Sequence, residues 1–457
     1  METKFQAFLR EVSGKTVGVI GMGVSNTPLV RLLLAAGARV TIRDRKPREQ
    51  LSEAAAEFER AGARLICGNT YLADIDEQIV FRTPGLRPDV PELLRAKANG
   101  SRITSEMEVF FAVCPAKTIG VTGSDGKTTT TTIIYELLRA AGHTCWVGGN
   151  IGTPLLDRVP EMTERDFCVL ELSSFQLMTM TQSPDIAVIT NLAPNHLDVH
   201  RSMEEYIEAK RNIIRYQKPS ARAVLNFDNA ITRELAPTAP GQVIPFSRKT
   251  QIPGGFFVRD HALCCDERVI LREEEIKIPG QHNVENYLAA IAAVDGLVSD
   301  AVIREVARTF GGVAHRMELV RVKDGVSYYN DSIASSPTRT IAGLRALPGK
   351  VILLAGGYDK KIPFDVLGPE VVAHVKALIL CGATAQKIED AVRAAPGFSA
   401  QALPIYREKC LEDAVARAHD IAAPGDIVTL SPACASFDQF PNFAARGDRF
   451  RALVKAL

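Results

Sequence analysis

The chain of 457 residues lacks an excess of charge of either sign, because 54 lysines and arginines balance 53 aspartates and glutamates. This total gives no indication of nucleic acid or a membrane surface as a partner. No apolar run approaches the ~18 residues of a membrane-spanning helix, and residues 1–10 lack the apolar core of a signal peptide. We therefore expect a soluble, intracellular protein.

Paired cysteines are also scarce. The nine cysteines are scattered, none are spaced as Cys-x-x-Cys, and only Cys264 and Cys265 are adjacent. Such a pattern is typical of reduced thiols and predicts a cytoplasmic protein. There is no internal repeat of fixed period and no low-complexity tract. The oligomeric state does not follow from the sequence, and a monomer is the favoured expectation.

The sequence does contain three segments in which short apolar runs alternate with helical patterns, and the second and third begin near Pro115 and His315. This alternation predicts α/β domains with parallel sheets covered on both faces. The length predicts two to four domains. We expect strands at 16–20, 39–42, 78–81, 167–172, 186–192, 326–329, 351–355, 377–381 and 427–430, helices at 28–36, 127–139, 203–216 and 281–294, and a strand-rich stretch at 250–278.

The most informative stretch is Gly123-Ser124-Asp125-Gly126-Lys127-Thr128-Thr129, which follows a predicted strand and opens a helix. Glycines let backbone N–H groups close around phosphate oxygens, and the helix N-terminus adds partial positive charge. A lysine at this place reaches the β- and γ-phosphates, and the next hydroxyl binds Mg²⁺. The loop has two residues between its glycines instead of four. The stretch predicts a site for a nucleoside triphosphate.

Other polar residues follow strand ends, where ligands of open α/β sheets bind. Glu171 ends a buried strand and is expected to complete a Mg²⁺ site. Gly21-Met22-Gly23 lacks the third glycine of a dinucleotide fingerprint, so NAD is not favoured, and a turn that holds phosphate or uridine is at least as consistent. Taken alone, His196 reads as a loop residue and Lys210 as a lysine on a solvated helix face.

Several of these motifs together resemble the Mur ligase family, the ATP-dependent enzymes that form amide bonds in peptidoglycan precursors. Its general signature is similar to the phosphate loop, Asn195-His196-Leu197-Asp198, Gly280-Gln281-His282-Asn283 and His315-Arg316. Ser431-Pro432-Ala433-Cys434-Ala435-Ser436-Phe437-Asp438-Gln439-Phe440 and Glu171-Leu172-Ser173-Ser174 resemble the member that adds D-glutamate to UDP-N-acetylmuramoyl-L-alanine. The likeness covers the whole chain.

The resemblance implies three domains, a Rossmann-like domain over 1–112 for the UDP substrate, a P-loop domain over 113–312 for ATP, and a Rossmann-like domain over 313–457 for the amino acid. It implies two Mg²⁺ ions and a lysine that CO₂ converts to a carbamate, here Lys210. Lys127, His196 and Lys210 are the implied catalytic residues. The implied contacts to ATP come from Gly123, Ser124, Asp125, Gly126, Lys127, Thr128, Thr129, Asn283, Asn286, Arg316 and Asp331. Those to the UDP substrate come from Ser25, Asn26, Asp44, Arg45, Gly85, Asn150 and His196. D-glutamate is implied to bind Lys360, Ser436 and Phe443, and metal to bind Thr128, Glu171, His196 and Lys210.

Two departures from the family pattern concern substrate contacts. Ile333 stands where a family lysine would help to hold a carboxylate of D-glutamate, and Lys360 or Lys361 is expected to supply that charge. Ser25 and Asn26 stand where a third glycine is common. Two rival functions are a folylpolyglutamate synthase-like ligase and a catalytically silent P-loop regulator.

Overall fold

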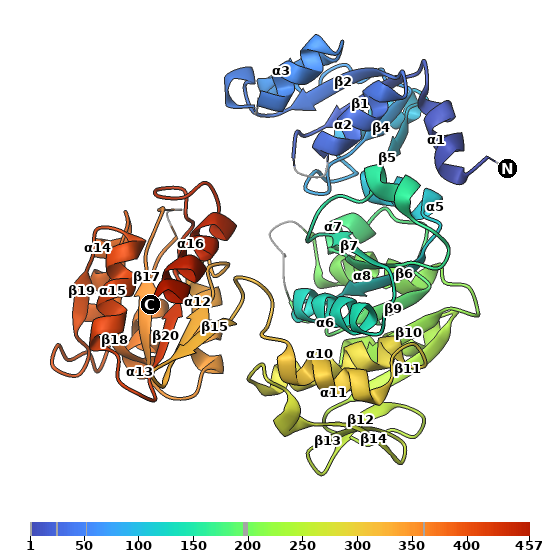
Figure 1. The fold of residues 1–457 in the computed structure, drawn as a ribbon. Coiled ribbons are helices and arrows are strands. Elements are labelled where there is room, and N and C mark those ends of the chain that lie inside the picture. The colour runs from blue at the N-terminus through green and yellow to red at the C-terminus, as the bar shows by residue number, and fades with distance from the viewer. Residues whose placement is uncertain (1, 24–25, 52, 195–199, 360–361) are drawn as a thin grey trace. The chain divides into compact units, whose positions relative to one another are not determined.

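The computed structural model describes residues 2–23, 26–51, 53–194, 200–359 and 362–457. The chain divides into two compact units, one of Met1–Glu275 with Val284–Val306 and the other of Ile276–Asn283 with Ala307–Leu457. The described residues form three sheets, two in the first unit and one in the second (Figure 1).

The N-terminal sheet is parallel throughout and has the order β3-β2-β1-β4-β5. This order reverses direction beside β1, so the Gly-rich turn after β1 lies at the switch point of the sheet, where open α/β sheets bind ligands. The strands are β1 (Thr16–Ile20), β2 (Arg39–Asp44), β3 (Arg64–Cys67), β4 (Ile79–Phe81) and β5 (Arg102–Thr104). The helices are α1 (Lys4–Val12), α2 (Asn26–Ala35), α3 (Glu53–Arg60), α4 (Pro91–Ala98) and α5 (Glu106–Val113).

The second sheet has nine strands in the order β14-β13-β12-β11-β10-β9-β6-β8-β7. β6, which leads into the phosphate loop, pairs in parallel with β8 and β9, so their carboxyl ends flank the loop. The strands are β6 (Lys117–Thr122), β7 (Cys145–Gly149), β8 (Phe167–Glu171), β9 (Ile186–Ile189), β10 (Arg222–Asn226), β11 (Gln242–Ser247), β12 (Phe256–Arg259), β13 (Ala262–Cys265) and β14 (Arg268–Arg272). The helices are α6 (Lys127–Ala140), α7 (Ser174–Leu177), α8 (Met203–Arg215), α9 (Ala230–Leu235), α10 (Gln281–Val294) and α11 (Asp300–Thr309).

The third sheet has the order β15-β16-β20-β17-β18-β19. Alternate residues of β17 point to opposite faces, so that Leu353 packs with α12–α14 and Ile352 packs with α15 and α16. The strands are β15 (Glu318–Lys323), β16 (Val326–Asn330), β17 (Val351–Ala355), β18 (Val375–Leu380), β19 (Ile405–Arg407) and β20 (Ile427–Leu430). The helices are α12 (Pro337–Ala346), α13 (Leu367–His374), α14 (Ala385–Arg393), α15 (Leu411–Ile421) and α16 (Phe443–Ala456).

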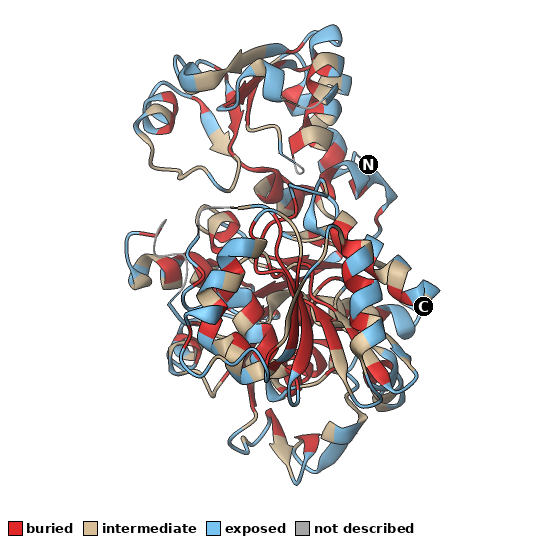
Figure 2. Cartoon of the chain, turned by 90° about the vertical axis from the view of Figure 1, so that its left-hand side faces the viewer, coloured by how far each residue is buried: buried red, intermediate tan, exposed pale blue. Residues whose placement is uncertain are grey.

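The mainly parallel α/β fold predicted from the sequence is confirmed, and the central strands are buried while the covering helices alternate between buried and exposed residues (Figure 2). Two places depart from a wholly parallel arrangement. β12–β14 pair antiparallel, as do β15 and β16. The β15–β16 turn is Asp324-Gly325 with φ of 50° and 79°, the backbone of a two-residue hairpin turn. No helix among the described residues is both long and apolar enough to cross a membrane.

Candidate functional site

The phosphate loop joins β6 to α6, and both of its glycines have positive φ, 156° at Gly123 and 78° at Gly126. Any side chain there would also collide with its surroundings. A Cβ on Gly123 would lie 1.9 Å from Oγ1 of Thr190, and one on Gly126 would lie 2.4 Å from Oδ1 of Asn286. Asn286 also accepts a hydrogen bond from Thr130 at 3.2 Å. The loop therefore requires glycine at both positions for conformation and for space.

The loop is fixed from behind by residues that follow β9, which the sequence reading did not single out. Thr190 donates to the carbonyl of Asp125 at 2.6 Å, and the amide of Asp125 donates to Oδ1 of Asn191 at 3.0 Å. The Ser124 hydroxyl lies 3.0 Å from the Tyr206 hydroxyl and donates to the Ala193 carbonyl at 2.9 Å. Thr190 and Asn191 lie just past the end of β9 at Ile189, but the predicted strand ran to residue 192, so the strand-end rule did not apply to them.

Two lysines lie at this loop. Nζ of Lys127 donates to the carbonyls of Gly123 and Ser124, both at 3.0 Å. Nζ of Lys210, from α8, donates to the same Gly123 carbonyl at 2.9 Å and to Oγ1 of Thr122 at 3.0 Å. The interpretation of Lys210 as a solvated helix lysine is wrong, because the residue is only 2% exposed.

Burial lowers the pKa of Lys210 well below its ordinary value, and the positive charge of Lys127 lowers it further. The carboxylates of Glu171 and Asp125 act in the opposite direction and are the smaller influences. A buried ammonium beside another cation is disfavoured, so the neutral amine is the form that this environment promotes. A neutral amine is a nucleophile, which a protonated lysine is not.

Glu171 ends β8 and is 2% exposed. One of its carboxylate oxygens accepts from the Thr128 hydroxyl at 2.6 Å and the other from Nδ2 of Asn150 at 2.8 Å. The Asn150 amide also donates to the Glu171 carbonyl at 2.8 Å. The structure thus brings Thr128, Glu171 and Asn150 together at the loop. Oxygen donors of this kind suit Mg²⁺.

Among the residues described, no group of three or more histidine, cysteine or acidic side chains could hold a metal ion. Thr128 and Glu171 therefore offer one hydroxyl and one carboxylate. A cation bound by this pair needs further oxygen ligands, which a nucleotide, water or other oxygen-bearing groups can supply. His196, one of the predicted metal and catalytic residues, lies outside the described residues.

In the N-terminal sheet, two of the predicted substrate residues contact the turn after β1. Nδ2 of buried Asn26 donates to the carbonyls of Ile20 and Gly21 at 3.0 and 2.9 Å. The Asp44 carboxylate accepts from the Met22 amide at 2.7 Å and from the Lys46 amide at 2.8 Å. Arg45 is exposed at the end of β2, and Ser25 lies outside the described residues.

Gly85 lies in a loop that a buried arginine holds in place. Arg82 donates from Nη1 to the carbonyls of Thr83 and Pro84 at 3.2 and 3.1 Å. From Nη2 it donates to the carbonyl of Phe175 and the hydroxyl of Thr179, both at 3.2 Å. Arg82 therefore ties the strand-end loop of the first sheet to the segment after Glu171. Arg82 directly follows β4, so the rule for polar residues past strand ends could have found it.

The second unit contains the remaining predicted nucleotide contacts. Asn283 is buried at the start of α10, where Nδ2 donates to the Pro279 carbonyl at 2.6 Å. Asp331 follows β16, is 4% exposed, and accepts from the Ser431 hydroxyl at 2.8 Å and the Met317 amide at 3.2 Å. Burial raises the pKa of Asp331 to about 7, against the lowering effect of these bonds and of Arg316.

A buried arginine that was not predicted from the sequence joins Ser332 to the segment before Ser436. Arg446, on α16, donates to the Ser332 hydroxyl at 3.0 Å and to the carbonyls of Cys434 and Ala435, both at 3.1 Å. The Ser332 hydroxyl donates to the Phe443 carbonyl at 2.8 Å. Ser436, the residue after Ala435, is buried, and Phe443 is 39% exposed. Lys360 lies outside the described residues.

The chain is similar in sequence to known proteins. Residues 121–294 match the family model of the Mur ligase middle domain, and residues 315–434 match that of the Mur ligase, glutamate ligase domain. A relative from Acetivibrio thermocellus, named UDP-N-acetylmuramoylalanine--D-glutamate ligase, is 53% identical over 100% of both chains. A relative of the same name from Clostridium novyi is 50% identical, again over 100% of both chains.

Solved structures share the fold at much lower identity. The UDP-N-acetylmuramate-alanine ligase of Thermotoga maritima is 18% identical with a TM-score of 0.60, over 97% of this chain and 99% of that one. A UDP-N-acetylmuramoyl-L-alanyl-D-glutamate--2,6-diaminopimelate ligase is 17% identical with a TM-score of 0.57, over 97% and 92%. The chain is thus about half identical to two relatives over its full length, and two of its segments match Mur ligase family models. The chain belongs to the Mur ligase family.

Proposed function

We propose that this chain joins D-glutamate to UDP-N-acetylmuramoyl-L-alanine and cleaves ATP to ADP and phosphate. Two relatives that match it over their full length carry the name of that ligase. The observation that carries the proposal is the convergence of Lys127, Lys210 and the Thr128–Glu171 pair on one glycine loop. A loop that only binds nucleotide has no use for a second, buried lysine with a lowered pKa.

The reaction requires activation of a carboxylate, because an ionised carboxylate is a poor electrophile at neutral pH. A carboxylate oxygen of the L-alanyl group attacks the γ-phosphorus of ATP, the bond to the bridging oxygen breaks, and ADP leaves. The amine of D-glutamate then attacks the acyl phosphate, the C–O bond to phosphate breaks, and the amine loses a proton. Both steps need charge neutralisation and positioning.

Lys127 supplies positive charge where the β- and γ-phosphates would lie, and the loop amides and α6 N-terminus supply further donors. We propose that ATP binds along residues 123–129, with Asn286 behind the loop, and that Asn283, Arg316 and Asp331 also contact the nucleotide. The buried hydroxyl–carboxylate pair of Thr128 and Glu171 fits a hard cation. Mg²⁺ held there would neutralise phosphate charge. We also propose that His196 takes part in binding a second Mg²⁺ ion.

We propose that Lys210 is modified by CO₂ to a carbamate. Its neutral amine reacts with CO₂, an N–C bond forms, a proton is released, and the product is an anionic carbamate. This change replaces a neutral amine beside Lys127 by anionic oxygen ligands of the kind that Mg²⁺ prefers. The lowered pKa of Lys210 supports it, because only the unprotonated amine reacts.

For the other substrates, we propose that Asn26, Asp44, Arg45, Gly85 and Ser25 contact the UDP group and that Asn150 and His196 contact the muramoyl group. Ser436, Phe443 and Lys360 would bind D-glutamate. The division into domains of residues 1–112, 113–312 and 313–457 is supported by one sheet within each range. All nine cysteines are free thiols, which supports the proposed cytoplasmic location.

Release of phosphate tests the function. Purified enzyme with Mg²⁺ and ATP should release phosphate only when UDP-N-acetylmuramoyl-L-alanine and D-glutamate are both present, and mass spectrometry should detect the amide product. Phosphate release with a pteroyl substrate and glutamate instead would identify the folylpolyglutamate synthase-like alternative. Tight ATP binding without turnover on either substrate pair would identify a silent regulator.

A further inference from the structure

Position 333 lacks the positive charge that is expected there in the proposed D-glutamate pocket. Its side chain is isoleucine, where the family resemblance implies a lysine for one substrate carboxylate. Ile333 is partly buried and its amide donates to the His315 carbonyl at 3.0 Å, so the backbone here is fixed. An apolar side chain cannot pair with a carboxylate, so the charge must come from another residue.

Arg339 is the described cation that reaches this position. It lies on α12, six residues after Ile333, and its Nη1 donates to the Ile333 carbonyl at 3.3 Å. Across the described ranges, this is its one side-chain hydrogen bond, and it takes part in none of the ion pairs. A guanidinium has five N–H donors, so most of its donors are available to a ligand. The side chain is exposed, and a ligand can reach it.

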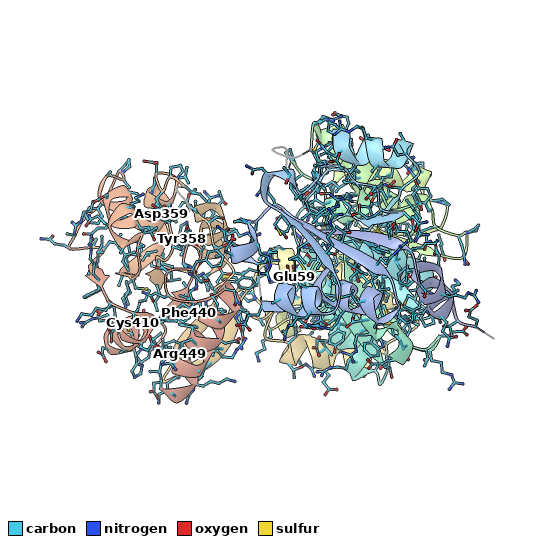
Figure 3. The ribbon with its side chains drawn as sticks, turned by 90° about the horizontal axis from the view of Figure 1, so that it is seen from above. Glu59, Tyr358, Asp359, Cys410, Phe440 and Arg449 are labelled. Carbon is cyan, nitrogen blue, oxygen red and sulfur yellow. The ribbon has the colours of Figure 1, made fainter. Side chains whose placement is uncertain are left out.

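The backbone around Ile333 belongs to the same corner of the fold as the other proposed D-glutamate residues. Its neighbour Ser332 is bonded to the Phe443 carbonyl at 2.8 Å and to Arg446, which also holds Ala435. The amide of Tyr358 donates to the Ala435 carbonyl at 2.9 Å. Tyr358 and Asp359 lie on the loop after β17, and Phe440 closes the Ser431–Phe440 segment (Figure 3).

A hollow at this corner is lined by three chain segments. Its lining includes Ser335 from the segment after Ile333, Tyr358 from the loop after β17, and Ala433 and Cys434 from the loop after β20. Ala433 has a φ of 58°, which is uncommon for a residue with a side chain. Such local strain is found at ligand sites. Arg339 thus contacts the carbonyl of Ile333, which lies two residues before Ser335 in the sequence, and Ser335 lines the hollow.

We propose that Arg339 binds one carboxylate of D-glutamate and replaces the cation that Ile333 cannot provide. This inference rests on the proposed function. A guanidinium offers two parallel N–H bonds to a carboxylate, a stronger and more directional contact than an ammonium makes. The charge of Arg339 already acts on this corner, because Arg316 and Arg339 both oppose the burial that raises the pKa of Asp331.

The test is the Arg339→Gln variant, measured as KM for each substrate with the other two saturating. We expect KM for D-glutamate to rise about 10- to 100-fold, which is the loss of a charged hydrogen-bonded contact. KM for ATP and for the UDP substrate should stay within about threefold. The melting temperature should not fall, because a cation in the first turn of α12 opposes the helix dipole.

Matched variants separate charge from structure. Arg345→Gln is the control, since Arg345 lies on the same helix and pairs with Glu370 at 3.0 Å, and its KM values should be unchanged. Arg339→Lys should recover part of the affinity, and Ile333→Lys added to Arg339→Gln should do the same. D-glutamine and D-isoglutamine each lack one carboxylate, and as competing ligands they identify which carboxylate Arg339 binds. Wild-type enzyme should prefer D-glutamate to both, and Arg339→Gln should lose its preference over one of them.

Three results would overturn the inference. They are an unchanged KM for D-glutamate in Arg339→Gln, an equal rise in Arg345→Gln, and an unchanged preference over both amides. Each result leaves the proposed function intact as long as wild-type enzyme forms the D-glutamyl product. If wild-type enzyme forms no such product, the proposed function itself has failed, and the two failures are therefore distinguishable.

Discussion

Lys127 and Lys210 donate to the same carbonyl oxygen, that of Gly123, at 3.0 and 2.9 Å. Because both bonds end on one atom, the two nitrogens lie within about 6 Å of each other. Two unit charges at that separation repel by roughly 3 kcal/mol at an effective dielectric of about 20. Only one of the lysines is buried to 2% exposure, so the burial selects Lys210 as the one that loses its proton.

The first prediction concerns the lysine that stays charged. Lys127→Ala removes positive charge where negative charge moves during phosphoryl transfer. Loss of one such electrostatic contact typically costs about 10²- to 10³-fold in rate. We expect kcat of the ligase reaction to fall by that factor, with a circular dichroism spectrum like that of the wild type.

Lys117→Ala is the control for this prediction, because Lys117 is exposed at the other end of β6. Its rate should match that of the wild type. A folded Lys127→Ala protein with full ligase activity would contradict the role of the loop lysine.

The second prediction concerns the choice of amino acid. Lys360→Ala should raise KM for D-glutamate far more than KM for ATP, because the two carboxylates of the substrate need separate donors. The added change Ile333→Lys should recover part of the loss. Steady-state kinetics with each substrate varied in turn measures both effects.

Lys350→Ala is the matched control, since this exposed lysine precedes β17 and donates to the Val372 carbonyl at 3.2 Å. It should leave all KM values unchanged. If Lys360→Ala also leaves KM for D-glutamate unchanged, the cation of this pocket is another residue, and Lys361 and Arg339 become the ones to test.

Much of the fold could be predicted, because the sequence pattern and the final structure depend on the same burial. Strands β1, β17 and β20 and helix α10 begin and end at the predicted residues. The two antiparallel regions were missed. Asp324-Gly325 is a two-residue turn signal, and the reading of alternating strands and helices gave it no weight.

The site could be predicted only in part. Gly123, Gly126 and Glu171 lie at strand ends, where a general rule places ligands, and the structure brings Lys127, Thr128, Asn150 and Lys210 to the same loop. Tyr206, Arg339 and Arg446 could not be found this way. They lie on helices, where a single polar residue looks like any residue of a solvated face, and only tertiary packing gives them their partners, Ser124, Ile333 and Ser332 respectively.

The third prediction is a pH dependence of stability. Glu106, on α5, is buried, and one of its oxygens has no hydrogen-bond partner among the described residues. Burial raises its pKa from 4.5 to about 7. Because the folded pKa is the higher one, the contribution of Glu106 to stability is complete below pH 4.5 and is lost as the pH rises through 7.

Glu106→Gln should remove this dependence. The free energy of unfolding of the wild type, relative to that of the variant, should fall by about 3 kcal/mol between pH 4.5 and 8 and then stay level. Urea unfolding at several pH values measures it. Glu161→Gln is the control, because Glu161 is exposed and, among the residues that the structure describes, its one ion pair is with Arg158 on its own helical turn. A difference that does not change with pH would mean that Glu106 titrates normally.

The last prediction concerns Lys210, for which the pattern of the sequence and the resemblance gave opposite readings. The hypothesis is that Lys210 is carbamylated in the active enzyme, and its burial and lowered pKa motivate it. Lys210→Ala should lose most activity. A short carboxylate such as acetate should restore part of it, because acetate fills the same space with the same charge. Depletion of dissolved CO₂ should lower wild-type activity, and added bicarbonate should restore it.

Two controls make this result specific. Lys210→Arg should be inactive and should not respond to acetate, because a guanidinium keeps the positive charge beside Lys127 and occupies the space. Lys218→Ala, at an exposed lysine after α8, should be fully active with or without acetate. Near-normal turnover of Lys210→Ala without added carboxylate would reject the carbamate. The buried amine would then serve only to hold the Gly123 carbonyl, and methionine at 210 should be tolerated because it fills the same volume without a charge.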